Sequence, residues 1–213
     1  MASGSVVDFT GDAIVNAANE GCLSGGGVDG AISAAGGKEL YQARLELPVV
    51  DTERSVRCPT GDARITRAFG RLRCRWVIHA VGPNYHVMRD SAAGDNCLCR
   101  AYTQSMMLAS QLPGLQTVAF ALLSSGVFRA DRPLRTVLEI GVCSVAALVR
   151  RAREDEGAIR LTDVYFVAFT PSERRELLHV AHSELPPPEA VQRPIIEQAS
   201  QGPEDPVALA EPE

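Results

Sequence analysis

Short, almost continuously apolar stretches constrain the fold of this chain more than any other feature of its sequence. They have the length of β-strands and are separated by longer segments with helical spacing. The stretches are Ser5–Phe9, Asp12–Ala17, Arg73–Val81, Thr117–Leu123 and Asp163–Phe169. Strands that face solvent on one side alternate apolar and polar residues, whereas strands covered on both faces do not. The pattern therefore predicts a three-layer α/β/α sandwich with a mixed, mostly parallel central sheet.

The segments between these strands predict helices. The expected helices are Val28–Gly36, Lys38–Leu47, Leu98–Gln111, Pro133–Arg153 and one that begins at Pro171–Ser172. The last of these has a capping box, because Thr170 stands three residues before Glu173. Sheets of this kind bind ligands beyond the carboxyl ends of their strands. We therefore expect the chemistry in the loops that follow Ala17, Val81, Leu123 and Phe169.

The end of the chain differs in composition from the rest. Residues 186–213 begin with three prolines and carry six acids, one base and no aromatic residue. Such a segment buries too little apolar surface to offset the entropy lost on ordering. We expect a folded domain over residues 4–185 and a disordered or loosely attached acidic tail over residues 186–213. The formal net charge of -5 belongs to this tail, and the domain is neutral.

Composition excludes several classes of protein. No apolar run approaches the length of a membrane span, and the first residues lack the layout of a signal peptide. We expect a cytoplasmic monomer whose 6 cysteines are reduced thiols. A nuclear location is also compatible with this composition. A neutral domain argues against broad nucleic-acid binding, which needs a basic face.

A glycine-rich loop follows the second predicted strand. Gly25, Gly26 and Gly27 stand directly before a predicted helix, where free backbone N–H groups and the helix N-terminus favour an anion. The loop predicts a phosphate cradle, and a flexible turn is the alternative. Gly25–Gly30 also fits the dinucleotide pattern G-x-G-x-x-G, with Asp51 in the place of its acidic partner. That match is weak, because in a dinucleotide fold the glycines directly follow the first strand.

Six ordered motifs together resemble the macrodomain family, and they are most similar to its MacroD-type ADP-ribosyl hydrolases. In chain order they are DAIVNAAN (Asp12–Asn19), GGGVDGAI (Gly25–Ile32), TGDARIT (Thr60–Thr66), VIHAVGP (Val77–Pro83), LLSSGVF (Leu122–Phe128) and VAF (Val167–Phe169). The resemblance extends over about residues 5–183. It implies a macrodomain fold over residues 4–185 and a site for ADP-ribose.

The resemblance assigns roles to individual residues. It places Asn19 against the distal ribose and Asp29 beside the scissile carbon C1″, where a carboxylate can orient or deprotonate water. Whether Asp29 is the base, or positions a water activated by the substrate phosphate, is left open. The other implied ligand contacts are Gly25, Gly26, Gly27 and Val28 in the first phosphate loop, Ser125, Gly126, Val127 and Phe128 in the second, and Phe169 against adenine.

Adenine recognition is the main departure from the family pattern. An aspartate element normally precedes the DAIVN motif by several residues, and here the connection to Asp8, Phe9 and Thr10 is shortened. Asp8 and Phe9 are the candidates for this role. No organic cofactor is implied. No metal is expected either, since the spacing of Cys22, Cys97 and Cys99 matches no zinc pattern.

The resemblance implies an ADP-ribose-binding hydrolase. Its expected reactions are removal of mono-ADP-ribose from acidic side chains of proteins and deacetylation of O-acetyl-ADP-ribose. The expected partners are ADP-ribose and mono-ADP-ribosylated proteins, with no membrane. Two alternatives stay open: a non-catalytic reader of ADP-ribose, and a phosphatase acting on ADP-ribose-phosphate.

Overall fold

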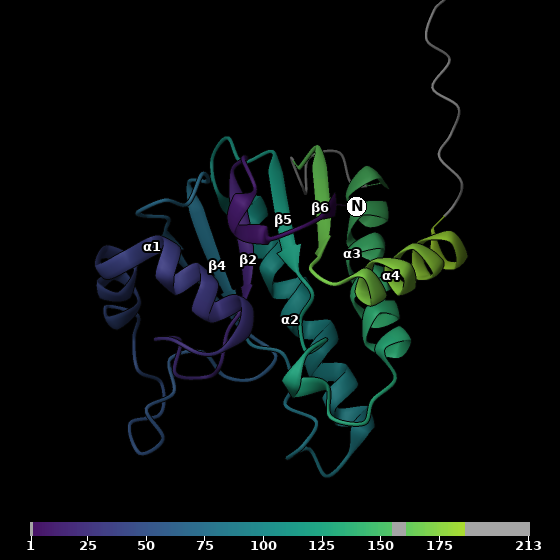
Figure 1. The fold of residues 1–213 in the computed structure, drawn as a ribbon, viewed down its shortest axis with the longest axis horizontal. Coiled ribbons are helices and arrows are strands. Elements are labelled where there is room, and N and C mark those ends of the chain that lie inside the picture. The colour runs from purple at the N-terminus through teal and green to yellow at the C-terminus, as the bar shows by residue number, and fades with distance from the viewer. Residues whose placement is uncertain (1, 155–160, 186–213) are drawn as a thin grey trace, which may run out of the picture.

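A six-stranded sheet forms the centre of the fold in a computed structural model that describes residues 2–154 and 161–185. In spatial order the strands are β1 (Ala2–Ser3), β6 (Asp163–Ala168), β5 (Thr117–Ala121), β2 (Ala13–Ala17), β4 (Trp76–Ala80) and β3 (Ala63–Arg67). Only the pairing of β3 with β4 is antiparallel among these described strands. The prediction of a mixed, mostly parallel sheet is confirmed (Figure 1).

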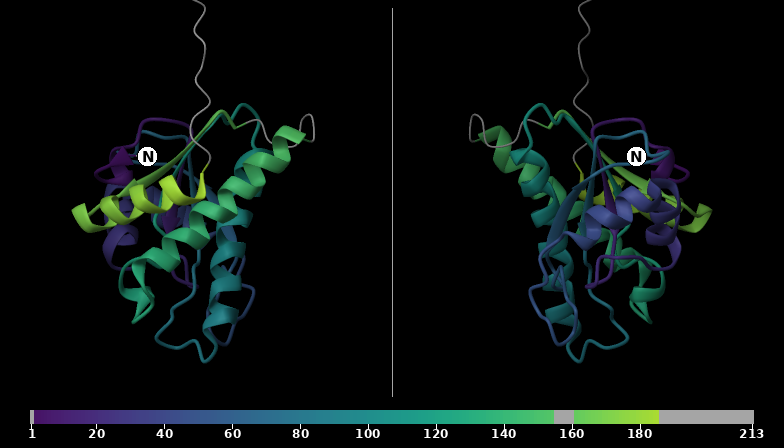
Figure 2. Two further views of the ribbon diagram at one scale, coloured as in Figure 1. Left: turned by 90° about the vertical axis from the view of Figure 1, so that its right-hand side faces the viewer. Right: turned by 90° about the vertical axis from the view of Figure 1, so that its left-hand side faces the viewer.

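Helices cover both faces of the sheet. They are α1 (Gly27–Leu45), α2 (Ser91–Gln111), α3 (Leu134–Glu154) and α4 (Pro171–Glu184). Neighbouring residues of a strand point to opposite faces, so Ile14 packs in the apolar cluster that contains residues of α1, and Val15 packs in the cluster that contains residues of α2, α3 and α4. Figures 1 and 2 show the sheet between these helices. The three-layer prediction is thus confirmed.

Three segments at the edges of the sheet differ from the sequence prediction, and one of them is β1 (Ala2–Ser3), which pairs with β6 but was not predicted. Ser5–Phe9 is not a strand: Val6–Asp8 forms a 3-10 helix, η1, whose first turn is capped by Ser5 Oγ accepting from the N–H of Val7 at 3.2 Å. The cap offers the backbone an alternative to strand pairing. The strand β3 was not predicted, because this antiparallel edge strand contains arginines and lacks a continuous apolar run.

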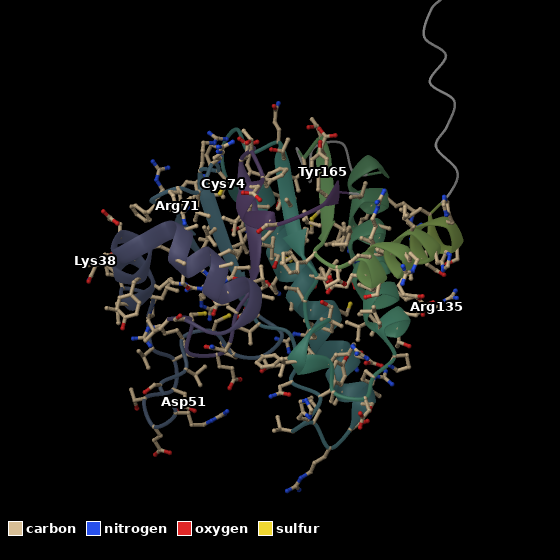
Figure 3. The ribbon with its side chains drawn as sticks, viewed as in Figure 1. Lys38, Asp51, Arg71, Cys74, Arg135 and Tyr165 are labelled. Carbon is tan, nitrogen blue, oxygen red and sulfur yellow. The ribbon has the colours of Figure 1, made fainter. Side chains whose placement is uncertain are left out.

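Helix α1 changes direction at Gly37. This glycine has φ 68° and ψ -156°, a conformation that glycine adopts without the penalty of a side chain. The break divides α1 where the sequence predicted two helices. Lys38, labelled in Figure 3, lies at the turn between the two halves. The second half of α1 therefore does not continue along the axis of the first.

Helix α4 ends at Glu184, beside the predicted domain end at residue 185, whereas β1 (Ala2–Ser3) pairs with β6 and precedes the predicted start at residue 4. The proposed tail, residues 186–213, lies outside the described residues and stays a prediction. None of the helices described here is long and apolar enough to cross a membrane.

Candidate functional site

A cavity of about 720 Å³ opens beyond the carboxyl ends of β2, β5 and β6. This volume lies within the range of about 300–1,000 Å³ that small-molecule sites occupy. Most of the residues expected to bind a ligand line it: Asn19, Gly25, Gly26, Gly27, Val28, Asp29, Ser125, Gly126, Val127, Phe128 and Phe169. The four loops predicted to carry the chemistry thus contribute to one cavity, which also includes Gly82 and Glu173.

The first wall of the cavity is the N-terminus of α1. Its N-cap residue, Gly26, supplies no side-chain hydrogen bond, and the N–H groups of Gly27 and Val28 have no acceptor within the described part of the chain. The first N–H groups of a helix need partners from outside it, and the helix dipole favours an anion there. This wall is suited to hold a phosphate group.

The second wall is the loop after β5. Ser124 has φ 54° and donates from Oγ to the carbonyl oxygen of Pro83 at 2.8 Å, which fixes the turn. Val127–Arg129 then forms a 3-10 helix, η2. Among residues 2–154 and 161–185, the N–H groups of Gly126, Val127 and Phe128 have no acceptor. The cavity is thus bordered by N–H donors on two sides.

Phe169 and Glu173 form the end of the cavity nearest to α4. The Phe169 side chain is unusually exposed for an aromatic residue, at 77%. Glu173 accepts from the N–H groups of Phe169 at 3.1 Å and Thr170 at 2.9 Å, which confirms the predicted capping box. The capping signal located Glu173 in the sequence, but its place in the cavity wall was not foreseen.

Asp8 and Phe9 are not brought into the cavity. Asp8 is exposed, and the Phe9 ring lies 5.5 Å from the ring of Tyr165, centroid to centroid. The turn η1 instead presents Val6 to the cavity, together with Gly4 and Ser5 before it. These residues were not foreseen, because the segment was predicted to be a strand. The assignment of Asp8 and Phe9 to adenine has no support from this geometry.

Asp29 lies in the cavity wall with only 2% of its surface exposed. Its Oδ1 accepts from Asn16 Nδ2 at 2.8 Å and forms an ion pair with Arg44 Nη2. Its Oδ2 has no hydrogen-bond partner among the described residues. Leaving a buried acceptor unsatisfied costs about 1–3 kcal/mol. The arrangement suits a carboxylate that completes its hydrogen bonds with water or ligand.

Asn16, Arg44 and His79 form a buried polar group behind Asp29. His79 Nδ1 lies 3.2 Å from Asn16 Nδ2 and 3.3 Å from Arg44 Nε, and its Nε2 lies 3.0 Å from Thr66 Oγ1. Burial, and then the positive charge of Arg44, hold the pKa of His79 well below its ordinary value of 6.5. His79 is therefore neutral inside this buried group.

Arg44 was missed by the sequence reasoning. The sequence held a signal, since Arg44 follows Leu40 by four residues and so shares a face of the predicted helix with it. The structure buries both side chains fully. A charged residue on the buried face of a helix points to a specific partner. Asn16 was likewise not among the predicted site residues, although its Nδ2 donates to Asp29 Oδ1 at 2.8 Å.

The loop that carries Asn19 is held in place by Glu20. Asn19 Nδ2 donates to the carbonyl oxygen of Ser24 at 2.9 Å, which closes the loop on itself. The Glu20 side chain accepts from the N–H of Thr60 at 3.1 Å and from Thr60 Oγ1 at 2.9 Å. The threonine that opens the TGDARIT motif thus anchors this loop.

The dinucleotide and metal alternatives gain no support. Asp51 forms a β-bridge with Val56 and accepts from the N–H of Arg54 at 3.1 Å. It does not line the cavity, and Figure 3 shows it on the loop that follows α1. Within residues 2–154 and 161–185, His, Cys, Asp and Glu side chains nowhere gather in threes that could hold a metal ion. The six cysteines are unpaired in the structure.

Two sequence relatives illustrate the family. The chain is 39% identical over 173 residues to a protein of Escherichia fergusonii named O-acetyl-ADP-ribose deacetylase, covering 81% of this chain and 88% of that protein. It is 42% identical over 142 residues to a macro domain-containing protein of Caldanaerobacter subterraneus, covering 66% of this chain and 77% of that protein.

Solved macrodomain structures are also similar to the chain. A variant of the Oceanobacillus iheyensis macrodomain with ADPR superposes with a TM-score of 0.72 at 27% identity, covering 85% of this chain and 90% of that one. The Trypanosoma brucei macrodomain in complex with ADP-ribose superposes with a TM-score of 0.64 at 31% identity, covering 83% and 66%. The Macro domain family model matches residues 15–140. The chain belongs to the macrodomain family.

Proposed function

We propose that this macrodomain binds ADP-ribose and hydrolyses esters of it. The substrates would be O-acetyl-ADP-ribose and proteins that carry mono-ADP-ribose on acidic side chains. Names and ligands of relatives support this proposal: relatives named O-acetyl-ADP-ribose deacetylase are 39% and 37% identical to the chain, and solved relatives hold ADP-ribose or ADP.

The observation that carries the proposal is the convergence of Asp29 and Asn19 at Gly25. A Cβ atom built on Gly25 would lie 2.8 Å from Asp29 Oδ2 and 3.2 Å from Asn19 Nδ2. A carboxylate and a carboxamide thus meet at one point of the cavity wall, next to the N–H groups that suit a diphosphate. A pure phosphate-binding site would gain nothing from a buried anion at that point.

The two N–H walls would hold the diphosphate, and Asn19 would contact the distal ribose. Asp29 would then orient a water molecule toward the scissile ester. The oxygen of that water bonds to C1″ of the distal ribose, and the bond from C1″ to the ester oxygen breaks. The proton of the water passes, by way of Asp29 or the substrate phosphate, to the carboxylate that leaves. The products are ADP-ribose and a carboxylic acid. Water is the co-substrate, and these steps need no further reactant.

Calorimetry and a hydrolysis assay on the same preparation test this function. We expect ADP-ribose to bind, and ADP-ribose and acetate to be released from O-acetyl-ADP-ribose. Binding without release of either product would make the protein a reader and contradict the hydrolase proposal. Release of inorganic phosphate from ADP-ribose-phosphate, with no ester cleavage, would contradict it in favour of a phosphatase.

A further inference from the structure

Arg44 is a fully buried arginine with a partner at each end of its guanidinium group. Nη2 pairs with Asp29 Oδ1, while Nη1 donates to Ser33 Oγ at 2.7 Å and to the carbonyl oxygen of Leu23 at 2.9 Å. Nε faces His79 Nδ1 at 3.3 Å. A planar guanidinium can hold several acceptors in one fixed geometry, which a single ammonium cannot do.

The break at Gly37 makes this contact possible. Asp29 and Arg44 are separated by 15 positions in α1, and along a straight helix that separation amounts to about 22 Å. Neither side chain could span such a distance. The change of direction at Gly37, with φ 68°, brings the second half of α1 back toward the first. The glycine thus contributes to the site without touching the cavity.

No other residue described here replaces Arg44 as the cationic partner of Asp29. Ser33 lies one helical turn after Asp29, but its hydroxyl donates to the main-chain oxygen of Asp29 at 2.7 Å and not to the carboxylate. Asn16 is a neutral donor, and burial keeps His79 neutral. Arg44 therefore supplies the positive charge that compensates the buried anion.

We propose that Arg44 is a positioning residue of the active site, which holds Asp29 by Oδ1 and leaves Oδ2 to the substrate water. The assignment rests on the proposed hydrolase function. Oδ1 already has two donors, Asn16 and Arg44, while Oδ2 has no partner among the described residues. The pairing thus selects which oxygen of Asp29 acts.

Arg44 would also permit the diphosphate to bind. Asp29 lines the cavity, whereas Arg44 does not. A buried carboxylate repels the negative charges of a diphosphate bound nearby, and repulsion is strong where water is excluded. Arg44 neutralises this charge from behind, without touching the ligand. Its loss should therefore weaken ADP-ribose binding through Asp29, and removal of the Asp29 charge should restore binding.

A double-mutant cycle tests the assignment with two readouts. The variants are Arg44→Met, Asp29→Asn, their combination and Arg44→Lys, and each is measured for ADP-ribose affinity by calorimetry and for kcat on O-acetyl-ADP-ribose. We expect Arg44→Met to weaken ADP-ribose binding at least about tenfold and to lower kcat about a hundredfold. The combined variant should bind within about threefold of Asp29→Asn and share its kcat. Arg44→Lys should keep binding within about threefold but lose about tenfold in kcat.

The cycle separates positioning from a purely structural role. The proposal would be overturned if Arg44→Met weakened ADP-ribose binding equally in the wild-type protein and in Asp29→Asn. A further tenfold loss of ADP-ribose affinity in the combined variant, relative to Asp29→Asn, would overturn it as well. This second comparison decides the matter even if Arg44→Met alone fails to fold, because the combined variant buries no unpaired charge. If the wild-type protein binds ADP-ribose without turnover, the hydrolase proposal fails and with it the role of Arg44 in leaving Oδ2 to a substrate water. The affinities then still decide whether Arg44 supports ADP-ribose binding through Asp29.

Discussion

Ser125 donates from Oγ to Oε1 of Glu173 at 3.0 Å. The bond joins the loop after β5 to the first turn of α4, across the end of the cavity that Phe169 borders. The other oxygen of Glu173 accepts from the N–H groups of Phe169 and Thr170. One carboxylate therefore fixes both the loop after β5 and the exposed aromatic residue.

Replacing Glu173 with alanine should weaken ADP-ribose binding more than it slows hydrolysis. Without this carboxylate, both Ser125 and Phe169 lose a fixed partner. We expect the Kd for ADP-ribose to rise about tenfold, and the free energy of unfolding to fall by about 1 kcal/mol through loss of the cap. Calorimetry and thermal melting measure the two effects. Glu176→Ala, on the same helix, is the control, and an equal loss of affinity there would contradict the account.

Gly25→Ala should damage the site, whereas Gly26→Ala should leave the fold intact. The new Cβ at position 25 would lie 2.8 Å from Asp29 Oδ2, but at position 26 nothing lies within 4 Å and φ is -89°. We expect Gly25→Ala to lower the free energy of unfolding by about 1–3 kcal/mol and to abolish most turnover. Gly26→Ala should stay within about 0.5 kcal/mol of the wild type. Equal unfolding free energies for the two variants would refute the convergence of Asp29 and Asn19 at Gly25.

His79 should make stability depend on pH in weak acid. Its pKa is lowered in the folded protein by burial and by Arg44, so below about pH 6.5 the unfolded chain binds a proton that the folded chain does not. The contribution of neutral His79 to the free energy of unfolding is thus fully present above that pH. Below it the free energy of unfolding falls, by up to about 1.4 kcal/mol per pH unit. Denaturant unfolding between about pH 6.5 and 5 measures the slope.

His79→Gln should lack most of this pH dependence, because glutamine does not titrate. His179→Gln, at an exposed position in α4, serves as the matched control and should retain it. A slope in His79→Gln equal to that of the wild type would assign the effect to other groups.

The sequence predicted the parallel core of this fold because its strands leave a direct signal. Thr117–Leu123 and Asp163–Phe169 are continuous apolar runs, and they correspond to β5 and β6. The edges left no such signal. β3 carries arginines, and Ser5–Phe9 has strand composition although the Ser5 cap directs it into a turn.

The site was predictable where local sequence determines local geometry. Gly25–Gly27 and Ser125–Phe128 lie in the cavity because each loop directly joins a strand to a helix. Arg44 was not predictable in the same way, since its contact with Asp29 depends on a helix break and on the packing of His79 from another strand. Long-range contacts of this kind are set by tertiary structure and leave only a weak trace in spacing.

Removal of residues 186–213 should leave the domain unchanged. This segment contains the net charge of the chain but little apolar surface, so its loss should cost neither packing nor ligand contacts. We expect the shortened protein to melt within about 2 °C of the full chain and to bind ADP-ribose within about twofold. A large drop in either quantity would place the segment in the fold or in the site.

The most direct test of the account is the rate at which Asp29→Ala releases ADP-ribose from a mono-ADP-ribosylated protein, at saturating substrate and beside the wild type. Positioned acid–base groups contribute about 10²–10⁴-fold to rates, so we expect kcat to fall at least about a hundredfold. Calorimetry should show that the variant still binds ADP-ribose. An unchanged kcat in Asp29→Ala would contradict the central claim that this carboxylate serves the reaction.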